Sequence, residues 1–351
     1  MIPRNDRFLR ACRREPVDRT PVWFMRQAGR SDPRYRAIRE RVSLSEIFQH
    51  ADLCAEIILL PVHSLGVDAA VLFADITLPF AGMGVTFAFQ ENIGPVLDTP
   101  VHDLAAVDAL RPFEPQQHVP AILEAIRLVT REATVPLIGF AGGPFTLASY
   151  LIEGGPSRDF SRTKALMFGQ PATWAGLMDH LTEATIRYLH AQVAAGVHAV
   201  QLFDSWAGAL APADYRQFVL PSARRIFEAV STLEVPAIHF ATGGAGLLPL
   251  LVEAGGDVLG IDWRMPLDEA WVRAGPRVAI QGNLDPATVL APFDLVAART
   301  ADVLQRAGGR PGHVFNLGHG VLPETSPEAL RRLVDFVHAY AEREASNVRR
   351  S

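Results

Sequence analysis

Short apolar runs alternate with longer helical patterns along the whole of this 351-residue chain. The runs are rich in Val, Ile, Leu and Phe, as buried strands are, and the segments between them repeat their apolar residues at helical spacing. Strands separated by helices pair in parallel, and eight such units close into a barrel. We therefore predict an α/β fold, a single (β/α)8 TIM-barrel domain over residues 1–351. The strands are expected at 21–25, 69–75, 136–141, 199–204, 235–241, 257–262, 277–281 and 313–317.

One segment breaks the alternation. Residues 83–99 contain two short runs, Val85–Phe89 and Ile93–Val96, which predict a small hairpin inserted after the second strand. A doubly wound open sheet would fit the same alternation and is the structural alternative. Helical patterns are expected at 45–60, 121–132, 172–194, 213–230, 295–306 and 327–345.

Composition excludes several kinds of partner. The net charge of −5 gives no general attraction for nucleic acid or acidic membranes. Cys12 and Cys54 form neither a disulfide framework nor a CxxC metal pair. The N-terminus has no apolar signal-peptide stretch, and no apolar run approaches membrane-spanning length. These features predict a cytoplasmic protein.

Polar residues follow the predicted strands at the ends where a barrel carries its active site. This distribution predicts one site, built from many loops. The residues concerned are Arg26, Asp75, Gly142–Thr146, Asp204–Trp206, His239–Gly243, Asp262–Trp263, Gly282–Asp285 and Gly318–Gly320.

The first of these loops places two arginines around Gly29. Arg26 and Arg30 are four residues apart, with Gln27 and Ala28 between them, and would share a face if the loop formed a helical turn. A guanidinium stays charged and matches carboxylate or phosphate geometry. A structural salt bridge is the alternative, but the spacing favours an anion-binding site.

Asp75 follows Val71–Ala74, a run apolar enough for the barrel wall. A carboxylate buried there needs hydrogen-bond partners. It is either a structural acceptor for loop N–H groups or an anion that awaits a ligand with N–H donors, and its place at a strand end favours the ligand.

Three further side chains are candidates. The glycine turn Gly142–Gly143 leads into a helix that carries Tyr150, which is either core filler or a site hydroxyl. Ser205 lacks the GxSxG context of a nucleophile, so a binding hydroxyl is the better interpretation. His319, between two glycines, is an even choice between a structural histidine and a group for ligand contact or proton transfer.

The sequence lacks the residues that several kinds of enzyme chemistry require. Lys164, the only lysine, lies outside the strand ends, which argues against Schiff-base chemistry. No GxGxxG follows a strand, so dinucleotide binding is unsupported. No cysteine follows Cys54, which excludes a Cys-rich zinc site on the later strands.

Four separated segments, in order, resemble the uroporphyrinogen decarboxylase family: 21–30, 139–154, 202–208 and 316–321. The resemblance covers essentially the whole chain and implies a (β/α)8 barrel, a homodimer and no metal or cofactor. Ser31–Asp32 depart from the family's aromatic-apolar pair. The resemblance implies that Arg26 and Arg30 bind substrate carboxylates and that Asp75 accepts hydrogen bonds from pyrrole N–H groups. It implies further substrate contacts from Gln27, Ala28, Gly29, Tyr150, Ser205 and His319.

The implied reaction is stepwise decarboxylation of the four acetate arms of uroporphyrinogen III, with Asp75, Arg26 and Arg30 as catalytic residues. Two rivals stay open. One is a zinc-dependent corrinoid or thiol methyltransferase, although its His-x-Cys element would here read His239-Phe240-Ala241. The other is a tetrapyrrole-binding protein without turnover.

Overall fold

A curled parallel sheet forms the centre of the molecule, which is a computed structural model describing residues 3–91 and 93–348, with side chains to residue 340. Within these residues the sheet has seven strands in the order β1-β4-β5-β6-β7-β8-β9. Each strand pairs in parallel with the next one along the chain. The strands are β1 (Ala70–Val71), β4 (Leu137–Gly142), β5 (Ala199–Phe203), β6 (Ala237–Phe240), β7 (Val258–Gly260), β8 (Ala279–Gln281) and β9 (His313–Val314).

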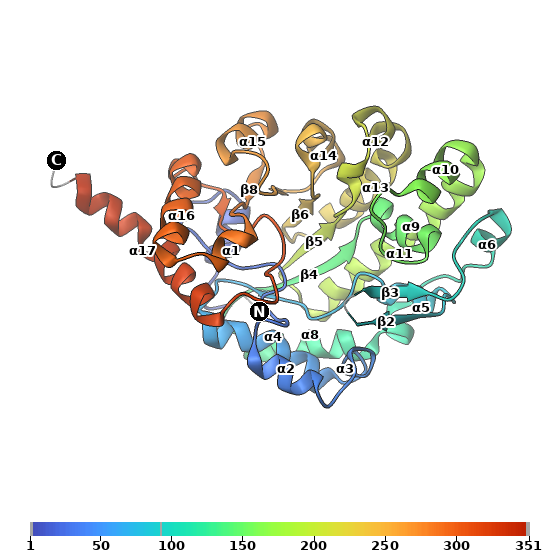
Figure 1. Cartoon of the computed structure of the whole chain (residues 1–351), viewed down its shortest axis with the longest axis horizontal. Helices are drawn as coiled ribbons and strands as arrows, with labels where there is room; N and C mark the ends of the chain where they lie inside the picture. The colour runs from blue at the N-terminus through green and yellow to red at the C-terminus, as the bar shows by residue number, and fades with distance from the viewer. Residues whose placement is uncertain (1–2, 92, 349–351) are drawn as a thin grey trace.

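Helices surround this sheet as a closed ring, in which α4 contacts α8 and the ring returns to α4 through α17 (Figure 1). The members in order are α4 (Ala51–Leu65), α8 (Pro120–Glu132), α11 (Pro171–Ala195), α13 (Leu220–Ser231), α14 (Leu248–Ala254), α15 (Leu267–Ala274), α16 (Phe293–Ala307) and α17 (Pro327–Val348). The strand order never reverses, so the doubly wound sheet is excluded and the α/β barrel is confirmed.

The remaining helices lie in loops and at the ends of the barrel. They are α1 (Arg7–Cys12), α2 (Pro33–Arg39), α3 (Leu44–Ile47), α5 (Leu78–Gly82), α6 (Leu104–Asp108), α7 (Pro115–His118), α9 (Pro144–Glu153), α10 (Ser161–Gly169) and α12 (Pro212–Phe218), with 3-10 turns at Ala207–Ala209, Gly244–Gly246 and Pro286–Leu290. No helix among the described residues is long and apolar enough to cross a membrane.

The segment expected as the first strand, residues 21–25, closes the barrel but is not a full strand. It forms a single parallel bridge, Val22 to Phe315, and its other side reaches residue 68 through a hydrogen bond from Asp68 N to Val22 O (2.8 Å). Two of its N–H groups are taken by side chains, since Val22 N donates to Asp68 and Phe24 N donates to Gln27, whereas Trp23 N donates to Phe315 O (3.3 Å). A strand needs these donors for its ladder, so only one bridge forms.

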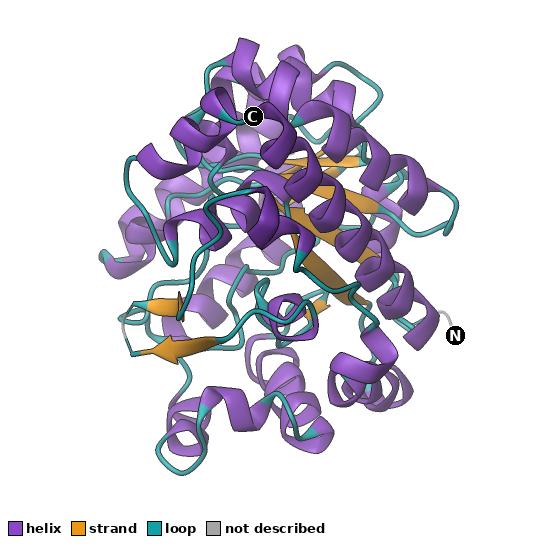
Figure 2. Cartoon of the chain, turned by 90° about the vertical axis from the view of Figure 1, so that its right-hand side faces the viewer, coloured by secondary structure: helices purple, strands orange, loops and turns teal. Residues whose placement is uncertain are grey.

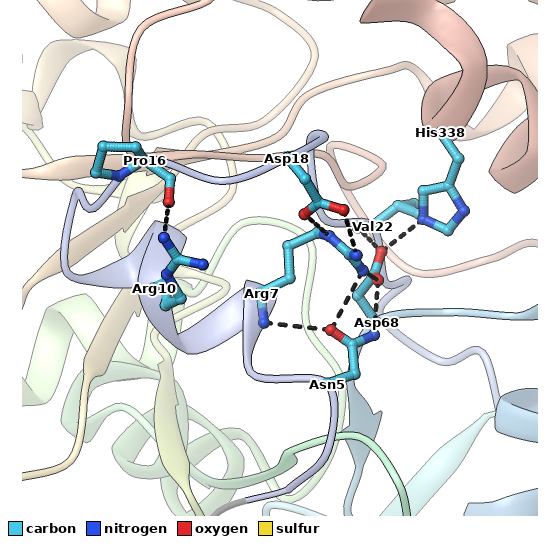
Figure 3. A network of polar contacts seen from close by, with 8 residues as sticks. All are labelled: Asn5, Arg7, Arg10, Pro16, Asp18, Val22, Asp68 and His338. Carbon is cyan, nitrogen blue, oxygen red and sulfur yellow. Dashed lines mark hydrogen bonds and ion pairs between the residues drawn. The ribbon is translucent and has the colours of Figure 1, made fainter.

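Asp68 anchors this closing segment at the amino end of β1 (Figure 3). The side chain is 1% exposed; Oδ1 accepts from Asn5 (3.0 Å) and Arg7 (2.7 Å), and Oδ2 lies 2.6 Å from His338 Nε2 on α17. Burial acts to raise the pKa of Asp68, but His338 and the hydrogen bonds from Asn5 and Val22 N outweigh it and lower that pKa. One carboxylate thus joins the first and last segments of the chain to the barrel.

Between β1 and β4 the chain forms a two-stranded antiparallel sheet from β2 (Phe87–Gln90) and β3 (Gly94–Leu97), in the segment where we expected the hairpin. Figure 2 shows the pair apart from the central strands. Its aromatic rings attach it to the barrel: Phe87 contacts Phe80 of α5 (centroids 6.2 Å apart) and Phe89 contacts Phe48 (5.8 Å).

Candidate active site

The strand ends bring the loop after Met25 and the loop after β9 into direct contact. Val321 N donates to Met25 O (2.8 Å), and the Arg26 side chain lies on Gly320, where a Cβ would be 2.5 Å from Arg26 Cδ. Arg26 adopts a left-handed backbone (φ 61°), which costs a non-glycine residue about 1 kcal/mol. The guanidinium is exposed, so this strained turn presents a charge at the mouth of the barrel.

Gln27 holds the same loop in place. Its side chain is buried, with Oε1 accepting from Phe24 N (3.0 Å) and Nε2 donating to Ala69 O (3.0 Å). The amide is therefore used by the protein, and a contact between Gln27 and a ligand would have to involve its main chain. Ala28 and Gly29 are half-buried, and a side chain on Gly29 would approach Arg26 O to 3.1 Å.

Arg30 lies farther along this loop and is exposed. The loop between Arg26 and Arg30 contains turns rather than the helical turn that would place both guanidinium groups on one face. Arg30 is near Tyr35 of α2, since its charge, with that of Arg39, opposes the effect of burial, which raises the Tyr35 pKa. The two arginines therefore have different surroundings.

Asp75 lies four residues after β1, within reach of the Arg26 charge. It is half-buried, and its Oδ1 accepts from both Thr77 N (2.8 Å) and Thr77 Oγ1 (2.6 Å). Burial raises the pKa of Asp75, while the Thr77 hydrogen bonds and the charge of Arg26 oppose that rise. Oδ1 accepts both Thr77 hydrogen bonds, so Oδ2 receives no hydrogen bond from Thr77.

Tyr150 of α9 and Trp206 of the loop after β5 form an aromatic pair. Their ring centroids are 4.3 Å apart, and Ser205, next to Trp206, is half-buried. Burial and the nearby Asp75 carboxylate raise the pKa of Tyr150, which Arg26 opposes. The phenol is therefore neutral at physiological pH and able to donate a hydrogen bond.

His319 completes the group around Arg26. Burial, together with the charges of Arg26 and Arg264, lowers the pKa of His319 to about 4, against the effect of Asp262. The imidazole is thus neutral at physiological pH, and each form of the ring offers one donor and one acceptor. The charge of Arg26 therefore acts on Asp75, Tyr150 and His319 alike.

Comparison with known proteins identifies the family of this chain. The family profile described as "Uroporphyrinogen decarboxylase (URO-D)" matches residues 3–340. A Thermus thermophilus protein named uroporphyrinogen decarboxylase is 55% identical over 337 residues, covering 96% of this chain and 98% of that protein. A Thermobifida fusca protein of the same name is 56% identical over 332 residues, covering 94% and 92%. The chain belongs to the uroporphyrinogen decarboxylase family.

Solved structures support the fold alone. A methyltransferase from Methanosarcina mazei superposes with a TM-score of 0.76 at 20% identity, covering 97% of this chain and 100% of that one. A B12-independent methionine synthase from Shewanella gives a TM-score of 0.59 at 13% identity, covering 86% and 89%. These values describe a shared barrel and carry no argument on chemistry.

The residue that a zinc methyltransferase would use faces away from the mouth. His239 of β6 is buried, its Nδ1 lies 3.3 Å from Leu251 O of α14, and its ring packs on Phe227 of α13 (4.7 Å). Ala241 occupies the position of the expected sulfur. Among the described side chains, no group of three or more His, Cys, Asp or Glu residues is arranged to hold a metal ion.

Sequence reasoning missed one group at the mouth of this family member and gave another no role of its own. Arg264, which was missed, follows β7, pairs with Asp262 (2.7 Å) and lies 4.0 Å over the ring of Trp263. Asp204, predicted only as one of the strand-end polar residues, is fully buried and accepts two hydrogen bonds from Thr146. The Asp-Trp-Arg sequence after a strand end was a usable signal for Arg264, whereas nothing local points to the pairing of Asp204 with Thr146.

Proposed function

We propose that this protein is a uroporphyrinogen decarboxylase that converts the four acetate arms of uroporphyrinogen III to methyl groups, giving coproporphyrinogen III and CO2. The observation that carries the proposal is that the charge of Arg26 acts on Asp75, Tyr150 and His319, in a chain of this family. A carboxylate, a cation and neutral hydrogen-bonding groups match a macrocycle with N–H groups at its centre and acids at its edge.

Asp75 is the proposed recognition group for the pyrrole N–H groups, because Thr77 leaves its Oδ2 uncovered. Arg26 and Arg30 would bind carboxylates of the substrate at two distances from Asp75. Tyr150, Ser205 and His319 would supply further hydrogen bonds, and Gln27, Ala28 and Gly29 would contribute through the shape and main chain of the first loop.

The chemistry needs no external electron sink. Protonation of the pyrrole ring beside an acetate arm creates a cation that accepts the electron pair of the breaking C–C bond. CO2 leaves, the methylene carbon takes up a proton to become a methyl group, and the ring loses the proton it gained at the start, so one proton is consumed for each acetate. An ionised Asp75 would stabilise the cationic ring, and one such fixed group contributes about 3 kcal/mol.

The proton donor is Arg26, His319 or a water molecule. A guanidinium is a very weak acid. His319, with a pKa lowered to about 4, carries little imidazolium at neutral pH. Arg26→Gln tests the first choice, because glutamine carries no acidic proton: near-native kcat with weaker substrate binding would show that Arg26 holds a carboxylate and does not donate the proton.

We also propose that residues 1–351 form one catalytic domain that acts without metal or organic cofactor, as a homodimer in the cytoplasm. The continuous ring of helices supports the single domain, and the chemistry above supports action without a cofactor. Sedimentation equilibrium of the purified protein tests the dimer, and metal analysis after gel filtration tests the absence of a resident metal.

The deciding experiment is incubation of the purified protein with uroporphyrinogen III under anaerobic, reducing conditions, followed by chromatographic separation of products by carboxyl number. Products with seven to four carboxyl groups are expected, and Asp75→Asn should form them about 100-fold more slowly or worse. Tight binding with no loss of carboxyl groups would instead identify a carrier. Stoichiometric zinc and methyl transfer would identify a methyltransferase.

A further inference from the structure

We infer that Asp204 is a positioning residue of this active site: its buried carboxylate ties the loop that carries Ser205 and Trp206 to the helix that carries Tyr150. The inference rests on the proposed function, since Ser205 and Tyr150 are proposed substrate contacts. It assigns a role to a carboxylate that the mechanism does not use.

Asp204 lies immediately after β5, where its N–H extends the ladder to Phe240 O (2.9 Å). Its side chain is 0% exposed and packs onto Gly143, where a Cβ would lie 2.4 Å from Asp204 Cβ. The bare backbone at Gly143 is therefore what admits this carboxylate between β4 and β5. Oδ2 has no hydrogen-bond partner among the described residues, so the acid is buried at a cost.

The other oxygen, Oδ1, caps helix α9. It accepts from Thr146 N (3.0 Å) and from Thr146 Oγ1 (2.8 Å). Thr146 is in the first turn of α9, where backbone N–H groups have no partner within the helix. The cap comes from another strand rather than from the residue before the helix, which is Gly143 and has no side chain to offer.

Thr146 passes the connection on to the loop after β5. Its hydroxyl gives its proton to Asp204 and accepts from Trp206 N (3.1 Å). The Trp206 ring in turn contacts Tyr150, which is one helical turn after Thr146 on α9 (4.3 Å between centroids). Two hydrogen bonds and one ring contact therefore link Asp204, Thr146, Trp206 and Tyr150 in a circuit of contacts. Ser205 lies between Asp204 and Trp206 in the chain.

This circuit requires an acceptor at Asp204 Oδ1 and a hydroxyl at Thr146. Without either, the Trp206 loop and α9 lose their link, and Tyr150 and Ser205 shift relative to Asp75. A displacement of about 1 Å in a catalytic constellation lowers the rate by as much as about 100-fold. Asn supplies the same acceptor oxygen as Asp, so the geometry is expected to survive Asp204→Asn.

The test compares Asp204→Ala, Asp204→Asn, Thr146→Val and Thr146→Ser with the wild-type protein in uroporphyrinogen turnover. We expect Asp204→Ala and Thr146→Val to lower kcat/KM by about 10-fold or more, mainly through kcat. Asp204→Asn and Thr146→Ser should rescue it to within about threefold. Crystal structures of the two damaging variants should show the Trp206 and Tyr150 rings farther apart than in the wild-type protein.

Thr300→Val is the matched control, because Thr300 is equally buried and its hydroxyl donates to Val296 O (2.7 Å) on α16, away from the mouth. Its thermal stability should fall as much as that of Thr146→Val while turnover stays unchanged. The inference fails if Thr146→Val keeps wild-type turnover, or if Asp204→Asn is as damaging as Asp204→Ala. A wild-type protein that does not decarboxylate would refute the proposed function instead, and unchanged ring positions in the variants would then refute the inference separately.

Discussion

Arg26 rests on the bare backbone of Gly320, two residues that are almost the whole length of the chain apart. A Cβ at position 320 would lie 2.5 Å from Arg26 Cδ and 2.9 Å from Arg26 Cγ. This contact fixes where the charge at the mouth points, and it makes the last loop of the barrel a support for the first.

Gly320→Ala should therefore displace the Arg26 side chain while leaving the fold intact. The atoms that the new methyl group meets belong to a flexible side chain rather than to backbone. We expect kcat/KM to fall by about 10-fold or more, with little change in melting temperature. Gly169→Ala, at a position with no atom within 4 Å, is the control and should leave both unchanged. Unaltered turnover in Gly320→Ala would argue against a precise role for Arg26.

Asp75→Asn should separate catalysis from stability. Burial raises the Asp75 pKa, so above the pKa of the unfolded chain the folded protein loses stability by keeping this group ionised. Asn removes that charge and can still accept from Thr77. Turnover is expected to fall by about 100-fold or more, while the melting temperature at pH 7 stays the same or rises. A clear drop in melting temperature would instead identify Asp75 as a structural acid.

The pKa of His319 should depend on the charge of Arg264. The pKa of His319 is lowered to about 4 by burial and by the charges of Arg26 and Arg264, so Arg264→Gln should raise it. The C–H resonances of His319, followed by NMR between pH 3 and 8, would report the change. Arg306→Gln, which breaks ion pairs with Asp268 and Asp302 on the outer helices, is the control and should leave the His319 titration in place.

Asp68→Asn should destabilise the barrel without altering its chemistry. Breaking a buried ion pair costs about 3 kcal/mol, and Asp68 binds Arg7 and His338 at the end of β1 opposite the mouth. The folded-state pKa of Asp68 is lowered, so its contribution to stability is present above the unfolded pKa and is lost as pH falls through the folded one. Urea denaturation should therefore show that the free energy of unfolding is higher for the wild type than for the variant at pH 7, and that this difference becomes smaller below pH 3.8. An equal difference at both pH values would contradict a stabilising role for the ionised Asp68 carboxylate.

The alternation of apolar runs and helical patterns was sufficient to predict the barrel, because strand and helix periods are local properties of the chain. The same pattern failed at residues 21–25. Their composition is that of a strand, yet the side chains of Asp68 and Gln27 take two of the N–H groups that a ladder would use. Those partners are not visible in the local sequence.

The sequence by itself determined which residue types stand at the strand ends: two arginines after the first apolar run, Asp75 after the second, and His319 between glycines near the last. It also determined the family, through motifs that survive as linear patterns. Only the tertiary structure decided that Arg26 rests on Gly320, that the Gln27 side chain is hydrogen-bonded within the protein, and that Asp204 caps a helix through Thr146. These relationships join residues far apart in the chain, and packing alone brings such residues together.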